Sequence, residues 1–411
     1  MSYAREFRVN WRALAGATLG LGSGLSINGY VHSILGPYLL EEFGWTKAEF
    51  ALIGSIYILG MISIPLSGRL ADVAGARAAI LAGVALYPVS WIALSMMGPD
   101  IRLYYAINIF QLLLCSTTTT TVYSRVVAER FTAARGIGLG IMACGPAIAG
   151  AVGSPILADY VAAHGWRAGA GAFAAFTLVA GIAALLLIPA LARPGQGAAP
   201  ARKAGADYRE IVRNPVFWLV FASVFLCCLP YALAQSQLNV MLLEKKLTPT
   251  AAGFVISTFA MGVMAGRFGL GAALDRFPTH IVAFVGMALS GVGLFILASP
   301  VTHVAPLLVG VALFGISFGA ESDIMGYAVA RYFGMENYSS VLGLLMAAAG
   351  AAMTTGSILL SAILARTDSY SPFMVVAGLS VLLGASLLLR LRTIGPSAPE
   401  SPQQAAPVPA E

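Results

Sequence analysis

Apolar and polar positions along this chain alternate on the length scale of a lipid bilayer. Long apolar runs, interrupted by short polar segments, follow one another from residue 13 to residue 390. About 20 mostly apolar residues are enough for a helix to cross a membrane. Lipid offers the backbone no hydrogen-bond partner, so each run is predicted to be helical. The predicted spans are 13–38, 50–67, 78–97, 103–123, 136–158, 169–190, 215–238, 251–271, 280–298, 304–329, 339–364 and 372–390.

A polar segment in the middle of the chain divides these twelve spans into two sets of six. Residues 193–214, RPGQGAAPARKAGADYREIVRN, are basic and rich in Gly, Pro and Ala, which is typical of a linker. The proline-rich residues 393–411 are predicted to form a disordered cytoplasmic tail. The predicted domains are therefore an N-terminal half (1–192), the linker, a C-terminal half (215–392) and the tail.

The two halves share short sequence matches at one constant spacing of 203 residues, which indicates an internal repeat. The matched pairs are Asp72 and Asp275, Leu139-Gly140 and Leu342-Gly343, and Gly153-Ser154 and Gly356-Ser357. Parallel repeats related by an axis along the membrane normal are a known plan of transporters. The predicted fold class is an all-α integral membrane protein, with twelve transmembrane helices in two pseudo-symmetric six-helix halves.

Composition supports the membrane assignment and excludes several functional classes. Hydrophobic residues make up 58% of the chain and charged residues 10%, whereas soluble domains carry about 25% charged residues. The net charge of +6 comes from basic residues scattered over short loops, so we expect no nucleic-acid partner. The four cysteines lie in apolar runs, and the four histidines form no metal-binding pair. Without a phosphate-binding loop either, we expect no metal, no cofactor and no enzyme activity.

The distribution of lysine and arginine predicts the orientation in the membrane. If both termini are cytoplasmic, the inside segments hold 17 of the 24 basic residues, the outside loops 6 and one span the last. Basic residues favour the cytoplasmic side. The first apolar run is also too long for the core of a cleavable signal peptide. We therefore expect a multi-pass protein of the plasma (inner) membrane with cytoplasmic termini, functional as a monomer.

Three charged residues fall clearly inside predicted spans: Arg267, Glu321 and Asp323. Charges in a membrane are costly and usually serve a function. Arg267 precedes Asp275 by eight residues and Asp323 precedes Arg331 by eight residues, so both lie about 12 Å inside the membrane at 1.5 Å per residue. A guanidinium can bind a carboxylate through two hydrogen bonds. We therefore expect Arg267 and Asp323 to meet, and to contact substrate.

The two acids cannot face one spot, because residues two apart on a helix point about 200° apart. Asp323 shares a face with Tyr327, and this face is predicted to line the cavity. Glu321 is then a proton site or a supporting group held by another helix. A carboxyl group away from water favours its neutral form, which suits a proton carrier. The alternative is a structural network that clamps spans eight and ten.

Polar residues in other spans are weaker candidates for substrate contact. Span one contains SINGYVH (26–32), span four TTTTTVYSR (117–125), and span seven ends in YALAQSQLN (231–239). For each candidate a structural role is the alternative, such as a hydrogen bond within its own helix. The candidates are Asn28, His32, Tyr123 and Gln237.

One loop motif resembles a known family. GRLADVAGAR (68–77) resembles the loop between spans two and three of the major facilitator superfamily, although Val73 replaces its usual basic residue. The resemblance implies a conformational loop motif, in which a glycine turn follows an acid that pairs with a neighbouring helix. Its residues are Gly68, Asp72, Gly75 and Arg77, with Asp275 and Arg276 in the second half.

Within this superfamily the chain looks like the monocarboxylate transporter and oxalate:formate antiporter branch. The similar stretches are residues 42–52, 129–141 and 319–334. Monocarboxylate transporters carry an arginine in span eight, four residues before a glycine, and Arg267 and Gly271 fit that place. The acid usual in this branch one turn before the arginine is Val263 here, so Asp323 or Glu321 is expected to couple the proton.

These features together predict a secondary active transporter of small organic anions, moved with protons by alternating access. The expected partners are the anion, protons and membrane lipid. The alternative is efflux of a drug or lipophilic cation in exchange for protons, with the acids binding the substrate. A receptor would usually need an added soluble domain, and an enzyme would need a nucleophile, base or metal that the sequence does not offer.

Overall fold

The computed structural model describes residues 3–132, 134–189, 211–333 and 338–393, and all of its regular elements are helices. The predicted linker falls outside the described residues except for 211–214, and the division of the chain there remains a prediction. The side chains of Asp72 and Asp275 also lie outside the described part.

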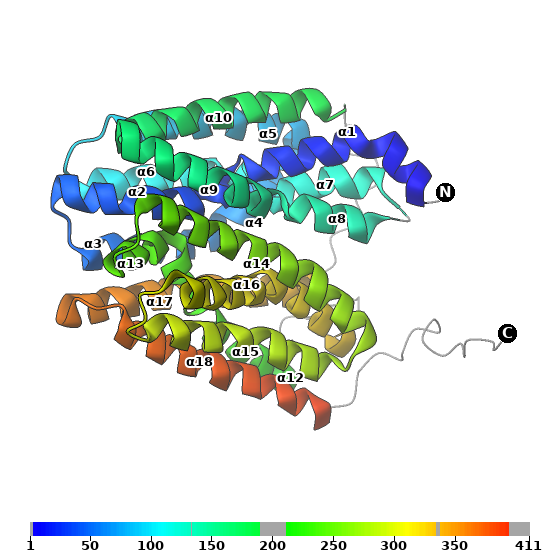
Figure 1. Ribbon diagram of the computed structural model, residues 1–411. Helices are drawn as coiled ribbons and strands as arrows, with labels where there is room; N and C mark the ends of the chain where they lie inside the picture. The colour runs from blue at the N-terminus through cyan, green and yellow to red at the C-terminus, as the bar shows by residue number, and fades with distance from the viewer. Residues whose placement is uncertain (1–2, 133, 190–210, 334–337, 394–411) are drawn as a thin grey trace.

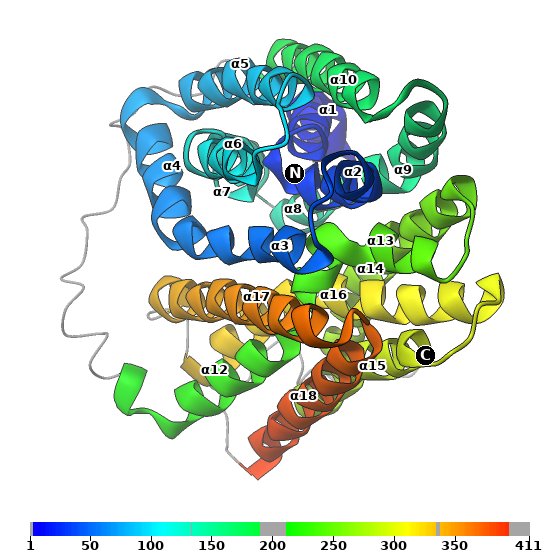
Figure 2. The same cartoon turned by 90° about the vertical axis from the view of Figure 1, so that its left-hand side faces the viewer.

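The helices before the linker form one group. In chain order they are α1 (Tyr3–Gly22), η1 (Leu25–Ile27), α2 (Asn28–Phe43), α3 (Lys47–Ala51), η2 (Leu52–Leu59), α4 (Gly60–Ala74), α5 (Ala76–Ser95), α6 (Ile101–Leu114), η3 (Ser116–Thr118), α7 (Thr120–Arg130), α8 (Arg135–Ala143), α9 (Gly145–His164) and α10 (Trp166–Leu187). They surround α1 and α2 in the upper part of Figure 2.

The helices after the linker form a second group beside the first. They are α12 (Pro215–Cys228), η4 (Leu233–Gln237), α13 (Leu238–Glu244), α14 (Pro249–Arg276), α15 (Thr279–Ala298), α16 (Val304–Phe333), α17 (Tyr338–Thr367), α18 (Ser371–Leu389) and η5 (Arg390–Thr393). The helix axes of both groups run roughly parallel, and the beginning of α1 and the end of α18 lie at the same end of the bundle (Figure 1). We call this the terminal end.

The prediction of a helical membrane fold is confirmed. Ten helical stretches among the described residues are long and apolar enough to cross a membrane. The other two predicted spans, 13–38 and 103–123, are each built from two helices joined by a 3₁₀ turn, η1 and η3. Twelve spans are therefore consistent with the structure, and two of them are broken near their middle.

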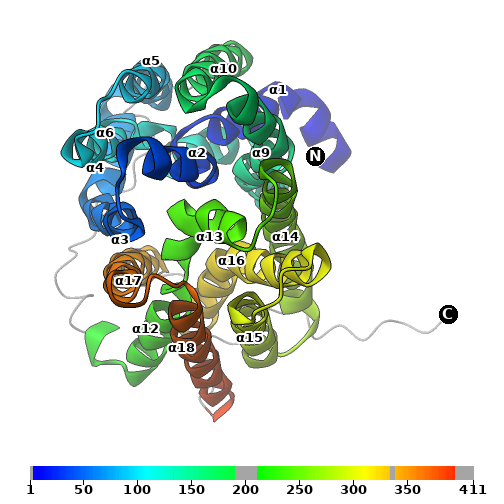
Figure 3. The same cartoon turned by 60° about the vertical axis from the view of Figure 1, so that its left-hand side comes forward.

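The groups meet along three pairs of elements. Helix α9 packs against α14, α17 packs against α3 and η2, and α2 packs against η4 and α13. Figure 3 shows α13 and α14 facing α2 and α9 across this boundary. The boundary between the groups is where an alternating-access transporter would hold its substrate.

Helices α14 and α16 approach so closely that their backbones touch. Two glycines of each helix, four residues apart, make this contact: Gly262 and Gly266 on α14, Gly315 and Gly319 on α16. A Cβ atom added to Gly266 would lie 1.9 Å from the carbonyl oxygen of Ile316. Such pairs of small residues let helices pack tightly in lipid. Arg267 directly follows this contact on α14, and Asp323 lies one turn beyond it on α16.

Substitution of Gly266 should therefore destabilise the protein. We expect Gly266→Ala to cost about 1–3 kcal/mol, because overpacking forces the two backbones apart. The measurement is the thermal unfolding midpoint of purified protein in detergent. Gly269→Ala on the same helix is the matched control, since nothing lies within 4 Å of its added Cβ. Equal midpoints for the two variants would contradict the close contact.

Candidate functional site

The sequence-predicted pair Arg267 and Asp323 does meet. Nη1 of Arg267 on α14 lies 3.4 Å from Oδ1 of Asp323 on α16. Charge-assisted hydrogen bonds are usually 2.7–2.9 Å long and often paired, so this is a single, loose contact. Nε of Arg267 is buried and has no partner among the described residues. The guanidinium therefore keeps donors for a further acceptor.

Arg267 lies on the wall of a cavity between the two groups of helices. This central cavity has a volume of about 240 Å³ and takes its walls from α2, η4, α9, α14 and α16. Its volume is below the usual 300 Å³ of pockets for drug-sized ligands, so it fits a small molecule. Besides Arg267, the main side chains in its wall are Tyr30, Gln235, Phe259 and Phe318. None of these four was singled out by the sequence as substrate-binding.

Asp323 is not part of this wall, but its side chain is 33% exposed while that of Arg267 is 20% exposed. The carboxylate lies on the side of Arg267 toward the terminal end, because α16 runs toward that end from Phe318 to Arg331 (Figure 1). Arg267 can therefore contact a molecule in the cavity and Asp323 outside it.

Glu321 lies on another face of α16, away from the central cavity. The Cys228 thiol of α12 donates a hydrogen bond to Oε1 of Glu321 at 3.3 Å. Glu321 also lines a separate small cavity of about 20 Å³ with Cys227 and Met287. The structure thus separates the two acids, as their spacing predicts, and the role of Glu321 in proton coupling stays a prediction.

Asn28 and His32 line a second, polar cavity of about 40 Å³ at the boundary. The Asn28 amide donates to Gln111 at 2.8 Å and accepts from Tyr87. His32 is 5% exposed, and its Nδ1 shares a hydrogen bond of 2.8 Å with the Tyr104 hydroxyl. Both residues face this polar cavity rather than Arg267.

The remaining predicted substrate residues lie apart from both cavities. Tyr123 is fully buried against Gly20 in a core formed by α1, α5, α7 and α8. Tyr327 packs against the core of the second group. The Gln237 amide donates to the Lys47 carbonyl at 3.3 Å and accepts from Tyr370 at 2.6 Å. Contact of these three residues with substrate stays a prediction.

The loop motif forms the turn between α4 and α5. Gly75 has a φ of +89°, a conformation that favours glycine, and it separates the two helices. Gly68 approaches Thr121 of α7, where an added Cβ would lie 3.3 Å from the threonine methyl group. Arg77 and Arg276 are exposed. The acid pairing implied by the motif lies outside the described side chains and remains a prediction.

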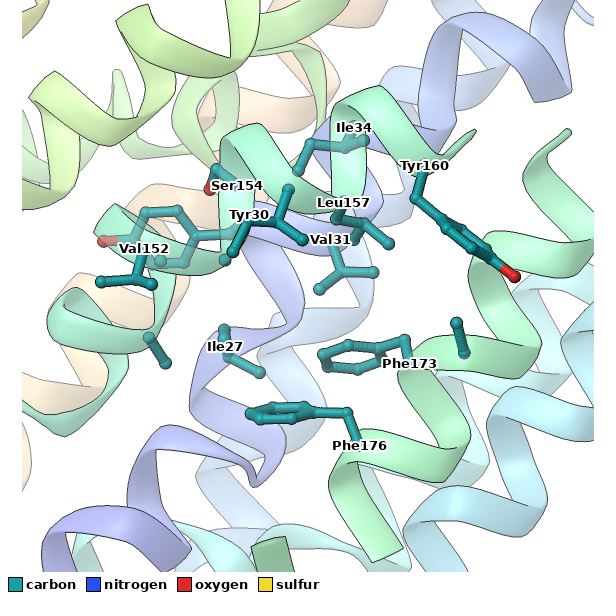
Figure 4. Close-up of a pocket in the computed structure, with 15 residues that line it drawn as sticks. Ile27, Tyr30, Val31, Ile34, Val152, Ser154, Leu157, Tyr160, Phe173 and Phe176 are labelled. Carbon is teal, nitrogen blue, oxygen red and sulfur yellow. The ribbon is translucent and has the colours of Figure 1, made fainter. Parts of the chain in front are cut away.

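A lateral pocket of about 380 Å³ opens between α2, α9 and α10, and its wall is almost entirely apolar. Figure 4 shows Ile27, Val31 and Leu157 lining it, with Phe173 and Phe176 at one side. Tyr30 belongs to the walls of both this pocket and the central cavity. Its side chain therefore separates the central cavity from the apolar pocket.

Hydrogen bonds and ion pairs join the two groups at the end of the bundle opposite to the terminal end. Lys47 of α3 pairs with Glu244 at the end of α13, and with Asp368 after α17 at 2.8 Å. Further bonds of this kind are Asn239 to Ser33, Ser357 to Ala51, Thr354 to Ser55 and Thr250 to Asp159. The groups are therefore fastened together at this end.

Within the described residues, no group of three or more His, Cys, Asp or Glu side chains could hold a metal ion. The cysteines Cys115, Cys144, Cys227 and Cys228 are all free and buried.

A helical membrane bundle in two groups, with a polar cavity and an ion pair between them, is the architecture of a secondary transporter. The sequence model of the Major Facilitator Superfamily matches residues 17–243 and 233–411, and the chain belongs to this family. The family assignment expected from the loop motif is thus confirmed.

Relatives of this chain are transporters with different named substrates. The MFS transporter asaE of Aspergillus flavus is 24% identical over 85% of this chain and 79% of its own length. The 4-hydroxybenzoate transporter PcaK of Pseudomonas putida is 22% identical over 73% and 74%. Monocarboxylate transporter 13 of Bos taurus is 22% identical over 90% and 89%.

Among solved structures, a point mutant of the peptide transporter POT is similar to this chain in fold. The TM-score is 0.71 at 16% sequence identity, over 94% of both chains. At this identity the likeness supports the fold alone.

Loss of Lys47 should loosen the fastened end. We expect Lys47→Met to shift part of the population toward a state separated at this end. The shift should be about twofold to fivefold, since partly exposed ion pairs contribute about 0.2–1 kcal/mol. The measurement is the distance distribution between spin labels on the exposed residues Glu41 and Arg366.

The matched control for this experiment is Lys246→Met, which removes an exposed lysine at the same end. The four native cysteines are buried and should label poorly. Distances that lengthen equally in both variants, or in neither, would mean that the Lys47 ion pairs do not hold the two groups together.

Proposed function

We propose that this protein is a secondary transporter of small carboxylates, coupled to protons, that works by rocking of its two halves. The observation that carries the proposal is the arginine of the central cavity. Arg267 faces the cavity, forms one loose contact with Asp323 and keeps a buried Nε without a partner among the described residues. Such a guanidinium suits a carboxylate that can accept two hydrogen bonds.

The Arg267–Asp323 contact suggests how a proton is coupled to the anion. A substrate carboxylate that binds Arg267 competes with Asp323 for the same donors. Once it loses its positive partner, the Asp323 carboxylate is partly buried and uncompensated, so it takes up a proton. When substrate leaves, Asp323 releases the proton and pairs with Arg267 again. The empty carrier then returns with its charges neutralised, which lowers the cost of moving them.

The geometry favours Asp323 over Glu321 as the proton carrier. Asp323 touches Arg267 and is partly exposed, so it responds to substrate and can exchange protons. Glu321 is instead held by Cys228 on another face of α16. Two relatives named for carboxylates, the 4-hydroxybenzoate and monocarboxylate transporters, support the substrate class.

The conformation and the predicted orientation fit together in this proposal. The two groups are fastened at the end opposite to the terminal end. With cytoplasmic termini in the plasma membrane, as the basic residues predict, that end is outside and the structure corresponds to a state closed to the outside. We further propose that one chain suffices, because the cavity takes its walls from both halves of a single chain.

Transport by purified protein in liposomes tests the proposal. With a pH-sensitive dye inside, we expect a gradient of a carboxylate such as lactate, pyruvate or benzoate to move protons in the same direction. Empty liposomes are the control, because undissociated acids cross bilayers unaided. Carboxylate gradients that move no protons above this background would contradict the proposal.

Variants of the ion pair separate anion binding from proton coupling. Arg267→Lys keeps the charge but loses the planar fork, and we expect uptake to fall about tenfold, which corresponds to about 1.4 kcal/mol. Asp323→Asn should retain exchange of labelled carboxylate but lose proton-driven accumulation. Glu321→Gln is the comparison variant. If only Glu321→Gln uncouples transport, Glu321 is the carrier instead.

Efflux of a lipophilic cation is the second candidate function. The rings of Tyr30, Phe259 and Phe318 in the cavity wall favour it, because aromatic faces attract cations. In the same liposomes, a cation gradient would then move protons in the opposite direction. That result would make Arg267 a structural partner of Asp323.

A further inference from the structure

Gln235 lies between the central cavity and the polar cavity and belongs to the walls of both. Its side chain reaches from the second group to α2 in the first. A Cβ atom added to Gly29 would lie 2.1 Å from Oε1 of Gln235, so only a glycine at that position leaves room for it. The Tyr57 hydroxyl donates a long hydrogen bond of 3.4 Å to the same oxygen.

A local break in the helix places Gln235 there. Residues Leu233–Gln237 form a π-helical turn between α12 and α13. Short π-helical turns are rare, and they occur frequently at functional sites. This one rotates Gln237 into hydrogen bonds with Tyr370 and Lys47 and leaves Gln235 at the two cavities.

The polar cavity offers hydrogen-bonding groups that the protein itself does not use. Nε2 of His32 and Oγ of Ser236 are buried, and neither has a partner among the described residues. Both residues line this cavity, together with Asn28 and Asn108. No residue of its wall is an acid, a lysine or an arginine. These groups suit a neutral polar group rather than a second carboxylate.

The sizes of the two cavities limit what can occupy them. The polar cavity of about 40 Å³ is close to the volume of one water, about 30 Å³, so it can take a hydroxyl but not a ring. The central cavity of about 240 Å³ holds a ring, and the rings of Tyr30 and Phe259 in its wall lie 6.1 Å apart between centroids. Arg267 supplies the positive charge in the same wall.

We propose that Gln235 and the polar cavity form a subsite for a hydroxyl group, so that the substrate is a hydroxylated aromatic carboxylate. The inference rests on the proposed function and names its substrate class. The carboxylate binds Arg267, the ring lies among Tyr30, Phe259 and Phe318, and the hydroxyl meets Gln235 at the entrance to the polar cavity. Ser236 and His32 then supply the hydrogen bonds beyond it.

The test compares three acids of similar size: 4-hydroxybenzoate, benzoate and 4-methylbenzoate. Their uptake into liposomes is measured with wild-type protein and with Gln235→Leu. Wild type should prefer 4-hydroxybenzoate, and Gln235→Leu should lower that preference about fivefold, as expected for one hydrogen bond. Benzoate uptake should change little. The methyl compound controls for shape, because it fills the same space without a hydroxyl.

Two further variants guard against a general loss of folding. Ser236→Ala removes a hydroxyl without a partner among the described residues, so it costs no existing hydrogen bond, and it should also lower the preference. Thr355→Val is the matched control, since this exposed hydroxyl bonds only to Ala351 in its own helix. Stabilisation of detergent-purified protein by each acid, measured as a shift of the unfolding midpoint, reports binding independently of transport.

The outcomes separate the two proposals. Equal uptake of the three acids by wild type, or a preference that survives in both Gln235→Leu and Ser236→Ala, would overturn the subsite while carboxylate transport stands. A fall of all three acids together in these variants would also overturn it, because the effect would not depend on the hydroxyl. If no carboxylate moves protons in wild type, the proposed function and the subsite fail together.

Discussion

The contact between the backbones of α14 and α16 is the constraint on which the site depends. Lipid supplies no hydrophobic force between helices, so close packing of small residues must hold them together. Glycines at both helices allow this approach, with Gly266 set against the Ile316 carbonyl and Gly319 against the Val263 carbonyl. Arg267 and Asp323 lie just beyond the contact, where the helices are still close enough for the two side chains to meet. A wider spacing would leave a buried guanidinium and a carboxylate unpaired, at a cost of several kcal/mol.

The rest of the central site is built around this pair by the opposite half. Helix α2 supplies Tyr30 and Gly29, and the glycine leaves space for Gln235. The walls thus come from both halves, while the charges come from one. Rocking of the halves would open and close the cavity without separating Arg267 from Asp323, so the ion pair can respond to substrate in either state. The fastened end, with Lys47 between Glu244 and Asp368, would have to release in the same motion.

The sequence predicts the helical membrane fold and the central ion pair, because both follow from simple counting. Apolar runs of span length must be helical in lipid, and equal distances from the loops place Arg267 and Asp323 at one depth. The breaks within spans were not predictable in this way. The π-helical turn at Leu233–Gln237 changes the phase of the helix, so Gln235, and not Gln237, reaches the cavity. The glycine pairs of α14 and α16 are visible as G-x-x-x-G at 262–266 and 315–319. Only the structure pairs these two segments with each other.

The central claim is that a carboxylate displaces Asp323 from Arg267 and that Asp323 then takes up a proton. The most direct measurement is proton uptake by purified protein in a weakly buffered solution when lactate, pyruvate or benzoate is added. The account predicts that binding consumes protons, up to one per carboxylate bound, and that Asp323→Asn binds the acid without this uptake. Binding that consumes no protons in wild type, or the same uptake in Asp323→Asn, would contradict it.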